Sequence, residues 1–531
     1  MTAENHRMYR SSPPGALTTT RRARAGAALA LSAVLLTLSA CGGGAAPVSG
    51  GATATGDAGG DKQDAPLEVS IMTLTPSTPP AADDNVLKRE IEKRTNTKLT
   101  INWISNNAYE EKLNITLASG QIPDLTVIKD PFGTTFRTLV RQGAFWDITP
   151  YIKDYPNLQQ GIPEVAWELT KQEDGRNYGI PRGRDAGDVS FLILRKDWLD
   201  QLGLKPPTTT DELYEVLKAF KEQDPDGNGK DDTFGLSVPF DSLSGAFQQI
   251  FTGVTGSWKL EDNKLVYAPF LPETRQSLEY LAKLYKEKLL PEDQLVLKLS
   301  QARDYYKGNR AGGVIDKTGT GPNVFAPELK KIVPSYKQSD FYPLVSMNGY
   351  VQKGTGFDGI LAIPKTVPEE KLKGILKLVD AWLSPEVSAV QRFGLEGVHH
   401  TVQNGVKVVD PEKLRADNAS DFNQIVNSID PALESPPAND ELKAFNEQKQ
   451  QVQAERAKIS RPDVGVGLYS ETAQKVLPDL EKRIADLKAK IVIGREPLSA
   501  WDDFVAKTQS EPQFIKMTEE ITNAYLKRSG K

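Results

Sequence analysis

Side-chain oxygens recur at alternate positions in the polar stretch from residue 224 to residue 232. Counting Asp224 as position one, oxygen-bearing side chains stand at positions one, three, five and nine, and a glycine stands at position six. This spacing suits a hard cation such as Ca²⁺, because a curled loop points the oxygens of alternate residues inward, and position seven offers its backbone carbonyl. The spacing predicts a structural calcium site whose ligands are Asp224, Asp226, Asn228, Lys230 and Asp232.

Two features separate this loop from that of a calcium sensor. Position twelve is Gly235, where a sensor loop carries a bidentate Glu. A strand-like stretch, residues 233–239, follows the loop in place of a second helix. An ion held here would therefore stiffen the loop without opening a pair of helices. The alternative is a polar turn of Asp, Asn and Gly that holds no ion.

A predicted helix positions the loop. Thr209 and Glu212 have the spacing of a capping box, which satisfies free N–H groups at a helix start. Apolar residues then recur at the helical spacing and share one face, namely Leu213, Val216, Leu217 and Phe220. We expect this helix to begin near Thr209 and to deliver the chain into the loop.

Length, charge and the rare residue types narrow the classes of function. A chain of 531 residues is expected to form two or more lobes. The first 40 residues contain five Arg and one Glu, so the remainder has a net charge of −9 against −5 for the whole chain. An acidic body argues against nucleic acid as a partner. Cys41 is the only cysteine, which excludes an internal disulfide, and His6, His399 and His400 show no zinc-binding spacing.

The first 66 residues have the pattern of a secretion and anchoring segment. Five Arg precede an uncharged stretch, residues 25–40, which is too short for a membrane span of about 20 residues. Residues 38–42 (Leu-Ser-Ala-Cys-Gly) resemble the bacterial lipobox, in which the cysteine is lipidated. We therefore expect a lipoprotein signal peptide (1–40), lipidation at Cys41 and a flexible tether (41–66), which together hold the body on the extracellular face of the bacterial cell membrane. The alternative is an ordinary signal peptide with a chance cysteine.

The body alternates predicted strands and helices, which favours α/β lobes with a largely parallel sheet. Residues 179–181 and 191–194 interrupt the alternation and are interpreted as a crossing between lobes. The strand at 313–315 is expected to return the chain to the first lobe. We therefore assign residues 67–182 and 311–358 to an N-terminal lobe. Residues 190–310 and 359–531 form a C-terminal lobe that ends in a helical region from about residue 440.

Four short segments resemble the extracellular solute-binding proteins of carbohydrate ABC importers: residues 118–124, 177–181, 195–204 and 396–400. The 224–232 loop is similar to the calcium loop of alginate-oligosaccharide-binding members of that family. The resemblance spans roughly residues 67–528. It implies a two-lobe, periplasmic-binding-protein-like (type II) fold with a central cleft and a hinge. It also implies a monomer that binds an oligosaccharide and docks on an ABC-importer permease.

Five residues are candidate sugar contacts, because sugars are held by aromatic faces and by planar polar groups. Trp258 stands in a glycine-rich segment, and Tyr178 precedes the expected hinge. Arg182 flanks the same crossing, Lys317 follows a predicted strand, and His400 lies near a carboxylate. The alternative for Trp258 and Tyr178 is packing in the core. The alternative for Arg182 is a charge exposed to solvent, and for His400 it is a structural histidine whose hydrogen bonds are satisfied within the protein.

Other functions remain open at this point. A secreted carbohydrate-active enzyme would need two carboxylates about 5–9 Å apart in a cleft, and Asp185, Asp188 and Glu396 are available. Sequence spacing does not say whether any two of them converge, and no Gly-x-Ser-x-Gly nucleophile motif is present. A lipoprotein that binds peptides or cell surfaces is a third possibility.

Overall fold

The computed structural model describes residues 65–403, 405–429, 433, 437 and 439–530. The predicted signal peptide, Cys41 and nearly all of the predicted tether lie outside these residues. Within the described part of the chain, no helix is long and apolar enough to cross a membrane. The body consists of two lobes, each built on its own sheet.

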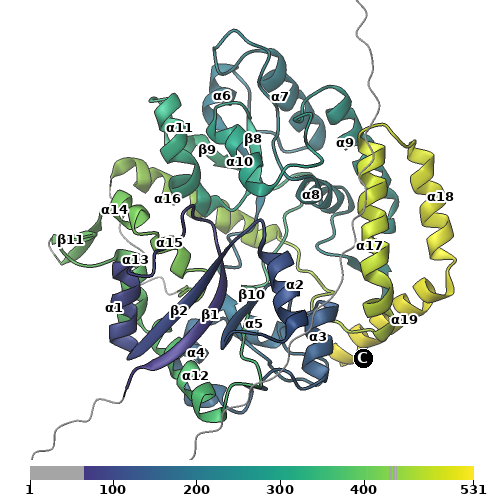
Figure 1. Cartoon of the computed structure of the whole chain (residues 1–531). Coiled ribbons are helices and arrows are strands. Elements are labelled where there is room, and N and C mark those ends of the chain that lie inside the picture. Colours follow the sequence, from purple (N-terminus) through teal and green to yellow (C-terminus); the bar gives the residue numbers. More distant parts are fainter. Residues whose placement is uncertain (1–64, 404, 430–432, 434–436, 438, 531) are drawn as a thin grey trace, which may run out of the picture. The chain divides into compact units, whose positions relative to one another are not determined.

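The first lobe contains a five-stranded sheet with the order β2-β1-β3-β10-β4 (Figure 1). Its strands are β1 (Leu67–Thr75), β2 (Thr97–Ser105), β3 (Leu125–Ile128), β4 (Ile180–Gly183) and β10 (Phe357–Ala362). The first three are parallel, and β10 pairs antiparallel with both β3 and β4. The larger helices of this lobe are α1 (Val86–Thr95), α2 (Tyr109–Ser119), α3 (Thr134–Arg141), α12 (Glu369–Leu383) and α13 (Pro385–Phe393). The expected α/β alternation is therefore confirmed in the first three strands.

Smaller elements complete this lobe. The short helices are α4 (Pro156–Gly161), α5 (Glu164–Leu169), α14 (Pro411–Ala416) and α15 (Ala419–Phe422). A separate hairpin consists of β11 (His400–Gln403) and β12 (Val406–Val409). One continuous core of buried apolar side chains runs from β1 through β10 and α12 to Phe422 and Val426. Residues 357–426 therefore belong to the first lobe.

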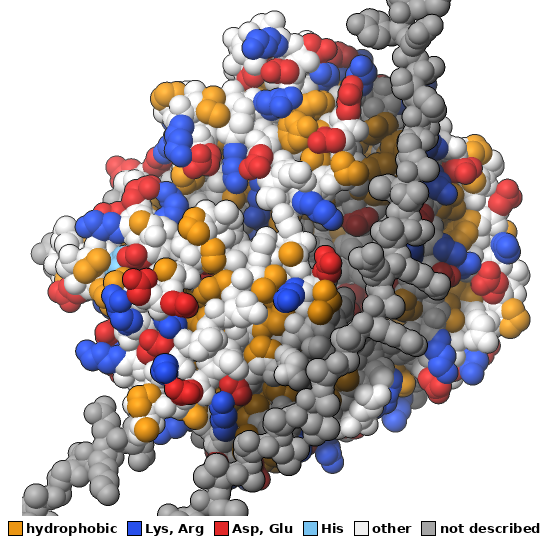
Figure 2. Space-filling model, in the orientation of Figure 1, with side chains coloured by type: hydrophobic (Ala, Val, Ile, Leu, Met, Phe, Trp, Pro, Cys, Tyr) orange, Lys and Arg blue, Asp and Glu red, His pale blue; other side chains and the backbone are white. Residues whose placement is uncertain are grey.

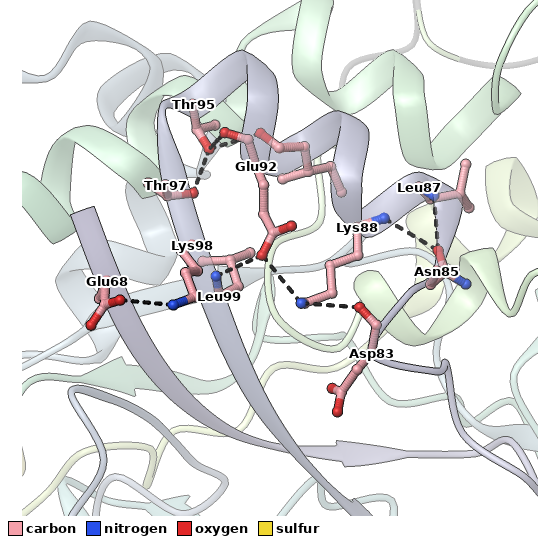
Figure 3. Close-up of polar contacts among 11 residues, drawn as sticks. Glu68, Asp83, Asn85, Leu87, Lys88, Glu92, Thr95, Thr97, Lys98 and Leu99 are labelled. Atoms are coloured by element: carbon pink, nitrogen blue, oxygen red, sulfur yellow. Dashed lines mark hydrogen bonds and ion pairs between the residues drawn. The ribbon is translucent and has the colours of Figure 1, made fainter. Parts of the chain in front are cut away.

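Polar contacts fix the path from α1 into the edge strand β2 (Figure 3). The Asn85 side chain caps α1, because its Oδ1 accepts hydrogen bonds from the backbone N–H groups of Leu87 (2.9 Å) and Lys88 (3.2 Å). One turn before the helix ends, Glu92 accepts the backbone N–H of Leu99 in β2 at 2.7 Å. The helix is thereby tied to the sheet that it covers.

The second lobe contains a three-stranded antiparallel sheet with the order β8-β5-β9. Its strands are β5 (Phe191–Arg195), β8 (Gly313–Asp316) and β9 (Phe341–Pro343), and a separate hairpin consists of β6 (Trp258–Glu261) and β7 (Lys264–Tyr267). Its helices are α6 (Lys196–Gln201), α7 (Thr210–Glu222), α8 (Phe240–Thr252), α9 (Pro272–Lys286), α10 (Leu299–Lys307) and α11 (Ala326–Ile332). The predicted capping box of α7 is confirmed, since Thr209 Oγ1 accepts the N–H of Glu212 at 3.2 Å and Glu212 in turn accepts the N–H of Thr209.

The C-terminal region is helical, as the sequence predicts. Its helices are α16 (Asp440–Ile459), α17 (Glu471–Val492), α18 (Leu498–Gln509) and α19 (Pro512–Arg528). Figure 1 shows α17 alongside α8 and α9, with α18 and α19 beyond it. Ile484, Trp501 and Phe514 are buried in the same core as α8 and α9. The last three helices are therefore an extension of the second lobe.

Two of the predicted lobe boundaries are wrong. β8 pairs with β5 and not with the first sheet, so residues 311–351 belong to the second lobe. β10 pairs with β3 and β4, so the chain re-enters the first lobe at Phe357. The crossing expected at residues 179–181 is in fact part of β4. A short apolar strand has the same pattern in either sheet, so its sequence does not specify its partner.

Charged side chains of both signs are interspersed over the face displayed in Figure 2. On the described residues of that face, lysine and arginine do not gather into a broad basic area of the kind that binds nucleic acid.

Candidate functional site

The two lobes are joined by connections that lie side by side. The chain leaves β4 at Gly183 and enters β5 at Phe191, and it returns between residues 351 and 357. The N–H of Arg184 donates to the carbonyl of Gly356 at 2.9 Å, and the N–H of Gly354 donates to that of Ala186 at 3.1 Å. A Cβ on Gly354 would lie 2.6 Å from the Ala186 carbonyl oxygen, so this close pairing requires glycine.

The topology places chemically useful residues of both lobes at this junction. β1, β3 and β4 all end at the edge of the first sheet from which the chain crosses. In the second sheet, Phe191 pairs with Asp316, so the end of β8 lies where the chain arrives. Ligands of open α/β sheets bind outside the carboxyl ends of the strands and between domains. The junction is therefore the candidate ligand site.

Charges from both lobes meet around Asp358 at the start of β10. Burial opposes ionisation of this carboxyl group, but the positive charges of Arg182, Lys317, Arg184 and Lys129 hold its pKa below the usual value. Lys317 follows β8 of the second lobe, whereas the other three basic residues belong to the first. Arg182 and Arg184 are bonded to carbonyl oxygens of the first lobe, whereas the partly exposed Lys129 and Lys317 can hydrogen-bond hydroxyls or pair with an acidic ligand.

Hydrogen bonds outside the Asp358 cluster also connect the lobes at the junction. Asn107, just beyond β2, donates from Nδ2 to Ser300 Oγ of α10 at 3.0 Å. Asp188, in the first connection, accepts the N–H of Gly319 at 3.4 Å. Such groups offer hydrogen-bonding partners to a polar ligand that separates or replaces these contacts.

The 224–232 loop directly follows α7 and curls as the spacing predicts. Asp224, Gly227 and Gly229 have φ values of +44°, +68° and +73°. The side-chain amide of Asn228 donates to Asp226 Oδ2 at 2.6 Å and to Asp232 Oδ1 at 3.1 Å. Side chains of loop positions three, five and nine therefore converge, as a cation site requires.

The carboxylates of this loop are close enough to affect one another. Burial, a hydrogen bond with Asp224 and the charges of Asp232 and Asp224 raise the pKa of Asp226 to about 6. The loop's own N–H groups occupy several of the oxygens: Gly229 donates to Asp224 Oδ2 at 2.9 Å, and Lys230 donates to Asn228 Oδ1 at 2.8 Å. Among the described residues, no group of three or more His, Cys, Asp or Glu is arranged to hold a metal ion.

The unusual residues after the loop have structural explanations. A Cβ on Gly235 would lie 2.7 Å from the Cβ of Leu217 in α7, so position twelve has no room for any side chain. Thr233 is buried and donates from Oγ1 to the Phe220 carbonyl at 2.9 Å, which satisfies the end of α7. Gly235 and Thr233 thus both allow the chain to pack directly against α7.

Comparison with known proteins decides the family. Residues 75–389 match the model of a family described as bacterial extracellular solute-binding protein. The chain belongs to this family. It is 32% identical over 481 residues to the polygalacturonan/rhamnogalacturonan-binding protein YtcQ of Bacillus subtilis (strain 168), an alignment that covers 88% of this chain and 93% of YtcQ. It is 31% identical over 462 residues to lipoprotein LipO of the same strain, covering 83% and 88%.

A solved structure supports the fold. The chain superposes on the alginate-binding protein AlgQ2, solved without calcium ion, with a TM-score of 0.67 at 21% sequence identity. The superposition covers 87% of this chain and 98% of AlgQ2. The two-lobe fold expected from the sequence is therefore confirmed over most of the chain.

Of the five predicted sugar contacts, Lys317 lies at the junction of this solute-binding protein. Trp258 is only 6% exposed, and its ring packs 5.2 Å from that of Tyr267 in the second core. His400 is buried, and its Nδ1 lies 2.8 Å from the Phe393 carbonyl oxygen. In this structure, Trp258 and His400 therefore follow the packing alternatives.

The other two predicted sugar contacts, Tyr178 and Arg182, form hydrogen bonds within the first lobe. Tyr178 precedes β4 and so lies at the sheet edge away from the junction, where burial and a 2.7 Å hydrogen bond to Asp174 raise its pKa to about 12. Arg182 is 2% exposed and donates to the Asp358 carbonyl at 2.6 Å and to Gln424 at 3.2 Å. Its guanidinium group therefore stabilises the interior of the first lobe by linking β4 to Asp358 and Gln424.

Sequence reasoning missed Asp358, Lys129 and the Asn107–Ser300 contact. Each lies at or just beyond the end of a strand or at the start of a helix. The signal that would have found them is their position at a single sheet edge, which depends on the strand pairing.

Proposed function

We propose that this chain captures an oligosaccharide at the junction between its two lobes and delivers it to the permease of an ABC importer. The observation that carries the proposal is membership of the solute-binding family. The alignment with this chain covers 93% of the relative YtcQ, which is named for binding polygalacturonan and rhamnogalacturonan. The charges around Asp358 suit a hydroxyl-rich ligand, and they also suit one that carries carboxylates. Acidic pectic oligosaccharides are therefore the first ligands to test.

The chain would act as a monomer without chemistry of its own, and a lipid at Cys41 would hold it on the extracellular face of the cell membrane. Support for the anchor comes from the lipobox-like sequence and from the lipoprotein relative LipO. Ligand binding would close the lobes by shifting the hinge equilibrium, which needs a higher affinity for the closed state.

We also propose that the 224–232 loop binds a structural Ca²⁺. The oxygens of Asp224, Asp226, Asn228 and Asp232, with the Lys230 carbonyl, would hold the ion, and its charge would relieve the repulsion that raises the pKa of Asp226. The convergence of Asp226 and Asp232 on the Asn228 amide supports this donor set. The ion would stiffen the loop and supply no reaction.

Titration calorimetry against a panel of neutral and uronate oligosaccharides tests the proposed function. We expect one ligand class to bind with a stoichiometry of about one, and chromatography of the recovered sugar to show it intact. Cleavage of the sugar with turnover would favour the carbohydrate-active enzyme instead. If no sugar in the panel gives a heat change larger than that of buffer dilution, the proposal of oligosaccharide capture is wrong.

A further inference from the structure

A segment of the C-terminal extension reaches the first lobe without entering its sheet. Residues 461–474, which comprise the connection between α16 and α17 and the first turn of α17, are named the strap here. Its middle contacts α3, since Arg137 donates from Nη2 to the Gly467 carbonyl at 3.2 Å and from Nη1 to the Leu468 carbonyl at 3.3 Å. Farther along, Thr134 donates to the Gln474 carbonyl at 3.3 Å. The strap is thus a contact between lobes that is separate from the two connections beside β4 and β10.

Tyr469 is the centre of this contact. Two guanidinium groups lie near its ring, that of Arg137 at 5.2 Å and that of Arg141 at 5.3 Å from the ring centre. Its hydroxyl accepts a 2.8 Å hydrogen bond from Arg141, whose guanidinium also pairs with Glu173 at 3.2 Å. One side chain of the strap therefore engages two arginines that are one helical turn apart on α3.

Both ends of the strap are fixed to the second lobe. Near its start, Thr255 donates to the Arg461 carbonyl at 2.6 Å. Arg528 of α19 donates to the carbonyls of Val464 and Val466, and Ser470 donates to Glu520 of the same helix at 2.5 Å. Because the second lobe holds the strap on both sides of Gly467 and Leu468, the contacts of these two carbonyls with α3 must break or stretch when the lobes separate.

The energetics of Arg137 suit a contact that forms and breaks. The residue is 1% exposed, and burial lowers the pKa of its guanidinium group. Among the described residues, no carboxylate lies within ion-pair distance of it, and carbonyl oxygens and ring faces take that place. Loss of water from the charge opposes docking of the strap, whereas the hydrogen bonds and the Tyr469 ring favour it. The two effects partly cancel.

We propose that the strap is a latch between the lobes: docking of Tyr469 against Arg137 and Arg141 restrains hinge opening, and its release widens the range of lobe separations. The latch consists of side chains and carbonyl groups of the chain itself, so it does not depend on the identity of the ligand. It gives the C-terminal extension a role in setting how readily the site opens.

Distance measurements between spin labels on the two lobes test the latch. Ile115 in α2 and Ile332 in α11 are each 55% exposed and lie in different lobes. Since Cys41 is the only native cysteine, a full chain with Cys41→Ala, Ile115→Cys and Ile332→Cys accepts labels at these two positions alone. We expect Tyr469→Ala to shift the distance distribution to longer values and to broaden it without ligand.

Two further variants make the test specific. Arg141→Gln removes the contacts of one exposed guanidinium with the Tyr469 hydroxyl and ring but leaves those of Arg137, so we expect a smaller shift in the same direction. Tyr214→Ala is the matched control, because Tyr214 also lies under a cation, Lys283, but within one lobe; it should leave the distribution unchanged. Distributions for Tyr469→Ala and Arg141→Gln that overlay the parent, in chains with native circular dichroism, would overturn the latch.

Discussion

At the residue scale, the loop after α7 shows how packing and ion binding share one segment. Its carboxylates lie close enough together to help raise the pKa of Asp226 to about 6. The residues that follow the loop pack on α7 and offer no further side-chain ligand at position twelve. Gly235 has no space for the Glu of a sensor loop, and Thr233 closes the end of α7. The local sequence is therefore that of a rigid site and not of a switch.

Replacement of Asp226 by Asn tests the calcium proposal. Without Ca²⁺, Asp226 has a pKa of about 6 in the folded chain, above the unfolded value of about 3.9. Between these values the folded state binds more protons, so its contribution to stability rises as pH falls through about 6 and is lost as pH rises. Asp226→Asn should remove this pH dependence and abolish the rise in melting temperature on adding Ca²⁺ at pH 7.

Asp231→Asn is the control, since Asp231 pairs with Lys221 outside the ligand positions. It should keep the response to Ca²⁺. If chelator and Ca²⁺ leave the melting temperature of the native chain equal, the ion has no place in the structure.

Restoring a side chain at position twelve should destabilise the fold. Gly235→Ala would place a Cβ 2.7 Å from that of Leu217, and we expect a loss of about 1–3 kcal/mol in the free energy of unfolding. Urea denaturation measures it. Gly245→Ala in α8 is matched, because no atom lies within 4 Å of the added Cβ, and it should be neutral or slightly stabilising. Equal stabilities for the two variants would contradict the packing described for Gly235.

At the element scale, the C-terminal helices pack on the second lobe through apolar side chains, and one amino group is buried in that contact. Lys488 of α17 is 5% exposed, donates to Gln248 of α8 and lies under the ring of Trp501. Burial lowers its pKa to about 8. A charged ammonium group at this position opposes docking of the extension at neutral pH.

Lys488→Met should therefore stabilise the protein at pH 7 by about 1–3 kcal/mol. The native lysine has a folded pKa of about 8, below the unfolded value of about 10.4, so its contribution to stability improves as pH rises between these values. The variant should lose that improvement in a series of denaturation curves from pH 7 to pH 10. Lys490→Met, at an exposed position of the same helix, should change neither; a destabilised Lys488→Met would show that the ammonium group is needed.

Local elements were largely predictable from the sequence, whereas their partners were not. The cap at Thr209 and the helices after residue 440 follow from spacing along the chain. The assignment of β8 and β10 failed because a four- to six-residue apolar strand carries no mark of its sheet. Trp258 failed as a sugar contact for the same reason: a glycine-rich neighbourhood describes the backbone but not which core the ring enters.

At the scale of the whole molecule, family and topology lead to the same place. A solute-binding protein needs a site that both lobes can reach, and the described connections bring Asp358 of one lobe near Lys317 of the other. The strap adds a contact between lobes that is separate from the chain connections beside β4 and β10. The account therefore depends on the ligand touching both lobes at once.

Hydrogen–deuterium exchange with and without the oligosaccharide found by calorimetry tests that dependence most directly. We predict slower exchange on both sides of the junction together, in residues 129–133 and 184–188 and in residues 317–320. A control sugar that gives no heat of binding should change none of them. Protection confined to one lobe, or located away from these segments, would contradict capture between the lobes.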